Sequence, residues 1–188
     1  WPFSKKIKAH CHFNELLVRQ ILKIEQKSVF LDSSKVIDHA LLLSLIDSFD
    51  FYIIWLSRDP RAQSHSALKY NPWSIEEAAR RWKKEMAVNE KILKKANIKY
   101  LPLQYEALCK NPKKEMTRLL QFVGLDANLF SLDFREKEQH IMGNASMRLG
   151  KDRKIVERKD WMEKLSQDQI KTIETITADY RHYYAATD

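Results

Sequence analysis

The sequence predicts an α/β protein in which a parallel sheet is flanked by helices, giving three layers. Three observations indicate this. Residues Phe51–Leu56 form a continuous apolar run with two adjacent β-branched residues, which is typical of a central strand covered on both faces. Short strand-like segments alternate along the chain with segments of helical periodicity. The chain has 188 residues, of which 44% are hydrophobic, so it can bury a core and we expect one domain over residues 1–188.

The elements before the central strand follow from the spacing of apolar residues. Asn14–Gln26 carries apolar residues on one side and is predicted to be a helix. Val29–Leu31 is predicted to be a second short strand, and it leads into Asp32–Lys35. Val36–Ile46 is then apolar at helical spacing, so a second helix precedes the central strand.

A polar junction follows the central strand. Arg58 comes directly after it, Asp59 can cap the next helix, and Pro60 suits the first helical turn. Ser66 lies eight positions after Arg58 (66 − 58), about two helical turns along. A guanidinium and a hydroxyl in this arrangement can both donate hydrogen bonds to one anion. Ligands of open α/β sheets bind at this carboxyl edge.

A long helix and a third strand are predicted next. Ser74 and Glu77 form a capping box, and Asn97 can end the helix. Its apolar residues step by three and four positions, and Trp82 among them is interpreted as a core aromatic rather than a sugar-stacking residue. Ile98–Leu103 then supplies the third strand.

Two further helices are predicted towards the end of the chain. Asn111 as a cap and Gly124 as a terminator bracket a short helix. Ser166 begins a second capping box, and helical spacing continues from it to Tyr184. Between these helices, Phe134–Lys159 is charged, contains two glycines and is expected to be a mobile loop.

The junction after the central strand resembles a motif of the sulfotransferases that use 3′-phosphoadenosine 5′-phosphosulfate, in particular their carbohydrate sulfotransferase branch. The matching residues are Arg58, Asp59, Pro60, Arg61 and Ser66. The resemblance implies that Arg58 and Ser66 bind the 3′-phosphate of this co-substrate. It also implies the P-loop, nucleotide-kinase-like fold of that family.

Three more segments resemble the family in the same order, and together they cover roughly residues 29–165. They are Asp32-Ser33-Ser34-Lys35, Tyr100–Leu108 with Asn111-Pro112, and His140–Arg148 followed by Ile155 and Trp161. The resemblance makes Tyr105 a candidate contact to the nucleotide and Arg148 a candidate second cation. Arg148 follows Gly143-Asn144 at a longer spacing than the family pattern.

The resemblance implies transfer of a sulfuryl group to a hydroxyl of a carbohydrate acceptor, including an anionic glycan, with no metal. Asp32 and Lys35 are the candidate catalytic residues, because related enzymes place residues near the acceptor at this segment. The alternative is that Asp32 caps a helix or pairs with a cation, which is commoner for an aspartate at a strand end.

The small-residue, hydroxyl-rich loop with which the family opens is missing from this sequence. The chain has only three glycines, Gly124, Gly143 and Gly150, and no G-x-x-x-x-G-K-[ST] motif. It begins with Trp1, so we expect an amino-terminally truncated sulfotransferase domain, with divergence of the loop as the alternative. Without the loop the leaving phosphate lacks its main electrostatic stabiliser, so an inactive relative that binds nucleotide or glycan without turnover is a serious rival.

The net charge of +8 favours polyanionic partners. A basic nucleic-acid-binding module is a second alternative, but the basic residues form no single stripe with aromatic residues between them, so no nucleic acid is expected. No segment approaches about 20 consecutive apolar residues, so a membrane anchor is expected only in a missing amino-terminal part. The expected location is the Golgi lumen or membrane in a eukaryote, and the cytoplasm otherwise. Cys11 and Cys109 have no zinc spacing; they could form one disulfide or remain two buried thiols.

Overall fold

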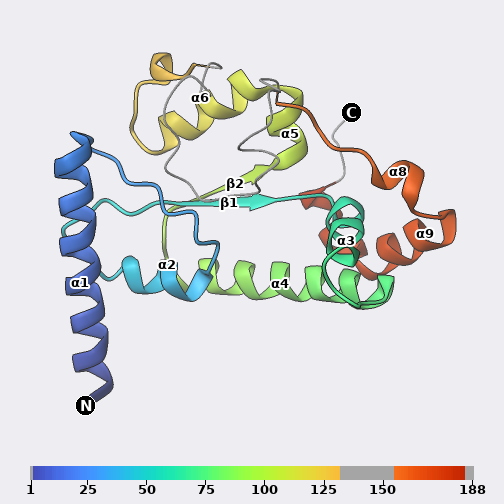
Figure 1. Ribbon diagram of the computed structural model, residues 1–188, viewed down its shortest axis with the longest axis horizontal. Coiled ribbons are helices and arrows are strands. Elements are labelled where there is room, and N and C mark those ends of the chain that lie inside the picture. The colour runs from blue at the N-terminus through green and yellow to red at the C-terminus, as the bar shows by residue number, and fades with distance from the viewer. Residues whose placement is uncertain (1, 132–154, 185–188) are drawn as a thin grey trace. The chain divides into compact units, whose positions relative to one another are not determined.

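The computed structural model describes residues 2–131 and 155–184 (Figure 1). These residues group into two compact units. The first unit comprises the residues up to 53 together with residues 87–100, and the second comprises residues 54–86 and those from 101 onward. Each unit is described by itself below. One domain over residues 1–188 stays a prediction.

The first unit is built on two helices, α1 (Pro2–Glu25) and α2 (Ile37–Leu43). The helix α1 begins earlier than the expected Asn14, because no glycine or proline interrupts the chain between Phe3 and Glu25. The Cys11 thiol donates a hydrogen bond to the Leu42 carbonyl, at 3.4 Å, where α1 packs on α2. Cys11 is therefore a half-buried free thiol, as is Cys109 in the second unit.

The predicted strand Val29–Leu31 is wrong. The segment has no regular secondary structure, and its three side chains are 52%, 40% and 71% exposed in chain order. The β-propensity of such residues is realised only when neighbouring strands and a packed face surround them, and no described segment pairs with these three.

The sheet has two parallel strands within the described residues, β1 (Ile53–Ser57) and β2 (Tyr100–Gln104) (Figure 1). The Ile53 N–H donates to the Lys99 carbonyl at 3.0 Å, which sets residue 53 opposite residue 100. The residues that follow the two strands, Arg58 and Tyr105, are therefore neighbours at the carboxyl edge. Leu56 is 55% exposed, so β1 is not covered on both faces as expected. The three-layer arrangement stays a prediction.

Helices surround the carboxyl ends of the strands in the second unit. The long helix α4 (Ile75–Ala96) runs from this unit into the residues assigned to the first. The other helical elements of the second unit are α3 (Pro60–Leu68), α5 (Tyr105–Lys110), α6 (Pro112–Phe122), η1 (Ala127–Leu129), α8 (Trp161–Lys164), α9 (Gln167–Ile176) and η3 (Ala178–Tyr183).

The predicted helix caps are confirmed. Asp59 accepts the Arg61 N–H at 2.8 Å, and Asn111 accepts the Lys114 N–H at 3.1 Å. Reciprocal side-chain and backbone bonds complete the capping boxes that begin at Ser74 and Ser166. Gly124 has a φ of +75°, the left-handed conformation that ends a helix without strain only at glycine.

The last predicted helix is shorter than expected. It ends at Ile176, and a 3₁₀ segment, η3, carries the chain to Tyr183. The Thr177 hydroxyl donates to the Ile173 carbonyl at 2.8 Å, a local bond that competes with helix continuation. The expected loop Phe134–Lys159 lies outside the described residues except for positions 155–159, which have no regular secondary structure.

The core of the second unit lies between α3, α4, α8 and α9. Its buried residues include Ala79 and Ile173, both 0% exposed, and Trp161 at 6%. Trp82 on α4 is 3% exposed, which confirms its interpretation as a core aromatic. Burial of this apolar surface is the main favourable contribution to the folding of the unit.

Arg61 connects α3 to the end of the chain. Its guanidinium pairs with Asp59, at 2.6 Å, and with Glu174 on α9, at 2.7 Å. The same guanidinium lies over the Trp161 ring, 4.5 Å from its centroid, and over the Tyr184 ring at 5.8 Å. Charge, planar hydrogen bonding and aromatic stacking meet in this one side chain.

We expect Arg61→Ala to lower the free energy of unfolding by about 2–4 kcal/mol, because it leaves the nearly buried Asp59 carboxylate without its cation. Urea unfolding followed by circular dichroism measures this loss. Lys83→Ala is the matched control: it removes an exposed pair with Asp179, at 2.7 Å, and should cost no more than about 1 kcal/mol. Equal losses in the two variants would contradict a special role for Arg61.

Candidate anion-binding site at the carboxyl edge of the sheet

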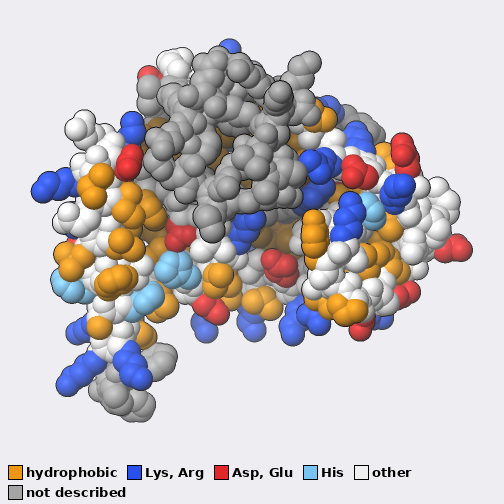
Figure 2. All heavy atoms as spheres, viewed as in Figure 1, with side chains coloured by type: hydrophobic (Ala, Val, Ile, Leu, Met, Phe, Trp, Pro, Cys, Tyr) orange, Lys and Arg blue, Asp and Glu red, His pale blue; other side chains and the backbone are white. Residues whose placement is uncertain are grey.

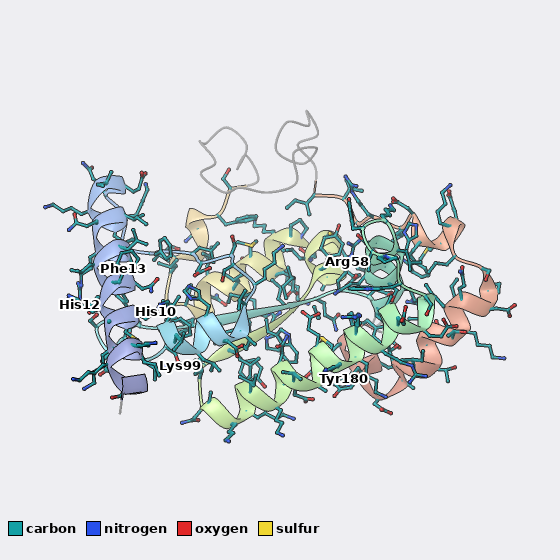
Figure 3. All side chains as sticks on the ribbon, turned by 60° about the horizontal axis from the view of Figure 1, so that its bottom comes forward. His10, His12, Phe13, Arg58, Lys99 and Tyr180 are labelled. Carbon is teal, nitrogen blue, oxygen red and sulfur yellow. The ribbon has the colours of Figure 1, made fainter. Side chains whose placement is uncertain are left out.

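Arg58 and Tyr105, two of the residues predicted to contact the nucleotide, lie against each other. The Arg58 guanidinium sits over the Tyr105 ring, 4.9 Å from its centroid. Figure 3 shows Arg58 at the end of β1, beside α3. Because Tyr105 follows β2 in the same register, the pairing is set by the sheet, and stacking on the ring fixes the plane of the guanidinium.

The Arg58 side chain keeps its hydrogen-bonding capacity. Its Nε is buried and has no hydrogen-bond partner, and no ion pair to it is found within residues 2–131 and 155–184. Its backbone is held, because the Trp82 indole N–H donates to the Arg58 carbonyl at 3.1 Å. A buried donor without an acceptor is costly, so such an atom indicates a missing acceptor. A phosphate oxygen meets this requirement.

Tyr105 and Cys109 add no negative charge beside Arg58. Burial and the neighbouring Cys109 raise the pKa of the Tyr105 phenol, and burial likewise raises the pKa of the Cys109 thiol. Both groups therefore remain protonated near neutral pH. The Tyr105 hydroxyl donates to the Val156 carbonyl at 3.3 Å, which ties the segment after residue 154 to α5.

Two acidic residues lie beside Arg58, and neither forms an ion pair with it in the described structure. The Asp59 carboxylate is bonded to Arg61. Glu106 Oε1 accepts the Asp59 N–H at 2.9 Å, and burial raises the pKa of the Glu106 carboxyl. Sequence reasoning assigned no role to Arg61 or Glu106, although both stand inside the motifs that carried the resemblance. The partners that define their roles lie far away in the chain.

The surroundings of α3 are basic. Burial lowers the pKa of His65, and the cations Lys69, Lys164 and Arg58 lower it further, whereas Asp160 acts in the opposite direction. Figure 2 shows Lys and Arg side chains gathered over the region of α3 and α8, with a histidine among them. A neutral histidine among cations indicates a positive local potential, which favours anions.

Ser66 lies in the last turn of α3 and is half-buried. The described contacts include none between Ser66 and Arg58. Ser64 on the same helix is 1% exposed, and no residue in the described part of the chain forms a hydrogen bond with its hydroxyl. The role of Ser66 in phosphate binding stays a prediction.

Asp32 and Lys35 belong to the first unit. Ser34 N–H donates to Asp32 Oδ1 at 2.7 Å, and His39 Nε2 lies 3.1 Å from Asp32 Oδ2. The His39 ring in turn meets the His10 ring of α1 edge to face, at 5.8 Å. Lys35 is exposed and has a positive φ of 63°. The structure thus gives Asp32 a turn with Ser34 and a close contact with the His39 ring, and its catalytic role stays a prediction.

Three remaining expectations concern Arg148, metal binding and membrane-spanning segments. Arg148 lies outside the described residues. Within the described part of the chain, no group of three or more His, Cys, Asp or Glu side chains is arranged to hold a metal ion. No helix in the same part is long and apolar enough to cross a membrane.

We expect Asp32→Asn to reduce stability near neutral pH by about 0.5 kcal/mol, a small value because the Asp32 side chain is still 27% exposed to water. Partial burial raises the pKa of Asp32, but hydrogen bonds from Ser34 and the nearby His39 outweigh it and hold the pKa below the usual range. The stabilisation is therefore present above the unfolded pKa of about 3.9 and is lost as the pH falls through the lower folded value. Urea unfolding of both proteins over a pH series tests this, and a difference that grows in acid would contradict it.

Comparison with known proteins finds a similarity in the region that contains the site. A model of the sulfotransferase family matches residues 49–128. The matched range contains Arg58, Ser66 and Tyr105, whereas Asp32 lies before it and Arg148 after it. No curated protein and no solved structure matches the chain. The match supports a transferase that moves a sulfuryl group. The similarity to the sulfotransferase family thus covers residues 49–128, which is less than half of the 188-residue chain.

Proposed function

We propose that the protein binds 3′-phosphoadenosine 5′-phosphosulfate at the carboxyl edge of β1 and β2 and transfers its sulfuryl group to a hydroxyl of a carbohydrate. The observation that carries the proposal is Arg58, whose buried Nε has no acceptor among the described residues while its guanidinium is stacked on Tyr105. The family match over residues 49–128 supports the reaction type.

The proposed roles follow from the chemistry of each group. Arg58 supplies a planar pair of donors to the 3′-phosphate, which is stronger and more directional than a contact from an ammonium. Ser66 adds a hydroxyl donor from α3, and Tyr105 presents an aromatic face to the adenosine. Arg148 is proposed as a second cation for the same phosphate.

The transfer is an in-line attack of the acceptor hydroxyl on the sulfur, with 3′,5′-bisphosphoadenosine leaving. Its rate depends on alignment of the reactants and on stabilisation of the leaving phosphate. We propose Asp32 and Lys35 for the acceptor side, as a base for the hydroxyl and as a cation near the sulfate. The net charge of +8 favours a carbohydrate acceptor that is itself anionic.

We expect Arg58→Ala to weaken the binding of 3′,5′-bisphosphoadenosine at least about thirtyfold, because it removes the charge-assisted hydrogen bonds to the phosphate. Isothermal titration calorimetry measures the dissociation constant. The matched control is Arg81→Ala, which also removes an arginine from an aromatic ring, that of Trp73 at 4.2 Å, but on the exposed surface of α4. This control should bind within about twofold of the wild type.

The same titrations separate the competing functions. Nucleotide binding without sulfate transfer to any carbohydrate favours the alternative of a relative that binds without turnover. Binding of duplex DNA that falls steeply with salt, together with no nucleotide binding, favours the nucleic-acid alternative. Equal nucleotide affinity of the wild type and Arg58→Ala would refute the proposed site.

Ser66→Ala should weaken nucleotide binding by about threefold to tenfold, the loss expected for one neutral hydrogen bond to the phosphate. Ser64→Ala on the same helix is the comparison, because that buried hydroxyl also has no partner among the described residues, and a loss of affinity in Ser64→Ala alone would assign the contact to Ser64. The same calorimetric titration compares the two. If neither substitution alters the affinity, Ser66 is not a phosphate ligand, and Arg58 alone anchors the anion.

A further inference from the structure

Glu106 joins the ends of the two strands. It is the second residue of α5, and its Oε1 accepts the Asp59 N–H at 2.9 Å. That N–H belongs to the peptide group between Arg58 and Asp59. The Glu106 carboxyl therefore fixes the backbone from which the Arg58 side chain extends.

The other oxygen of the Glu106 carboxyl has no such partner. Oε2 is buried, and no described residue donates a hydrogen bond to it. An ionised oxygen in this position has lost its hydration without a replacement, whereas a protonated carboxyl carries no charge. Burial accordingly raises the pKa of Glu106.

The charged groups that face Glu106 come from three elements. Asp59 at the β1–α3 turn and Glu157 after residue 154 raise the pKa further, whereas the backbone N–H groups of Asp59 and of Glu106 itself lower it. Arg61 neutralises Asp59, at 2.6 Å, and Lys159 lies 3.3 Å from Glu157. Two acids thus face Glu106, and each has a cation of its own.

The third element is α5 itself. Cys109 stands one turn after Glu106, and both Glu106 and Arg58 act electrostatically on its thiol. Glu106 and Arg58 thus share a neighbour as well as the peptide between residues 58 and 59. An anion that binds to Arg58 will therefore act on the Glu106 carboxyl.

We propose that Glu106 is a positioning residue for the anion site and that its carboxyl takes up one proton from solvent when a phosphate binds to Arg58. The inference rests on the proposed binding of nucleotide at Arg58. A phosphate bound to Arg58 adds negative charge near a carboxylate already faced by two acids, and repulsion between like charges favours the neutral form of the Glu106 carboxyl. Of these three acids, Glu106 is the one that forms no ion pair with a described cation.

The direction of the pH dependence follows. The pKa of Glu106 is raised in the free protein and is raised again in the complex, so protons are taken up between these two values. Binding of the phosphate strengthens as the pH falls through this window. Above the window the complex keeps an ionised carboxylate beside the anion and binds more weakly.

Glu106→Gln separates the two parts of the inference. The amide retains an oxygen that can accept the Asp59 N–H, but it cannot ionise. Calorimetry with 3′,5′-bisphosphoadenosine in buffers of different ionisation enthalpy counts the protons taken up between about pH 5 and pH 8. The phosphate itself titrates near pH 6, at about the same pH with either protein, so the readout is the difference between wild type and variant.

We expect the wild type to take up more protons than Glu106→Gln, and the variant to bind about threefold to tenfold more tightly near neutral pH, since one pKa unit of coupling is a tenfold change in affinity. The control is Glu115→Gln, which alters a buried glutamate of the second unit that is paired with Arg118 at 2.8 Å. Its proton uptake should equal that of the wild type.

The outcomes distinguish this inference from the proposed function. Equal proton uptake by the wild type and Glu106→Gln, with binding retained in both, overturns the inference and leaves nucleotide binding intact. Unchanged affinity in Arg58→Ala overturns the proposed function itself. A carbon NMR titration of the Glu106 carboxyl in the free wild-type protein needs no variant and no nucleotide, and a midpoint at or below the ordinary glutamate value also overturns the inference.

Discussion

The carboxylate and the N–H of Asp59 hold the second unit together at the end of β1. The carboxylate caps α3 and binds the Arg61 guanidinium, which reaches Glu174 on α9, while the N–H is bonded to Glu106 on α5. One residue thereby joins both strand ends to three helices. Because Arg61 already pairs with the Asp59 carboxylate, Arg58 is not needed to neutralise it. The two arginines of the motif thus have different roles: Arg61 stabilises the fold, and Arg58 remains available to bind an anion.

Local signals in the sequence predicted most of the helices, because the interactions that start and end a helix lie within four residues. The caps at Asp59, Ser74 and Asn111 are of this kind. The prediction of a strand at Val29–Leu31 was wrong because a strand is stable only when it pairs with a neighbouring strand, and the local sequence does not reveal that partner. The six-residue helix α5 was missed for the opposite reason, since it is too short to show a period.

The candidate site was predicted in part. The position of Arg58 at a carboxyl edge followed from the strand pattern, and its contact with Tyr105 follows from the register of two parallel strands. The role of Arg61 depends on Glu174, which lies 113 residues further along, and that of Glu106 depends on a backbone N–H 47 residues before it. No periodicity or cap encodes such partners, so they emerge only when the chain is folded.

Two kinds of electrostatic interaction attract an anion to the site: screened attraction by exposed cations and direct contact with the half-buried Arg58. The many exposed cations that make up the net charge of +8 act through water, and salt screens them over a Debye length of about 8–10 Å. Arg58 is half-buried beside groups that burial keeps protonated, so its attraction for a phosphate is much less screened. Salt should therefore slow the arrival of an anion more than it weakens the final contact. In contrast, the affinity for a nucleic-acid duplex that is bound only by exposed cations would fall steeply with salt. The salt dependence of the affinity therefore distinguishes a specific phosphate site from a generally basic surface.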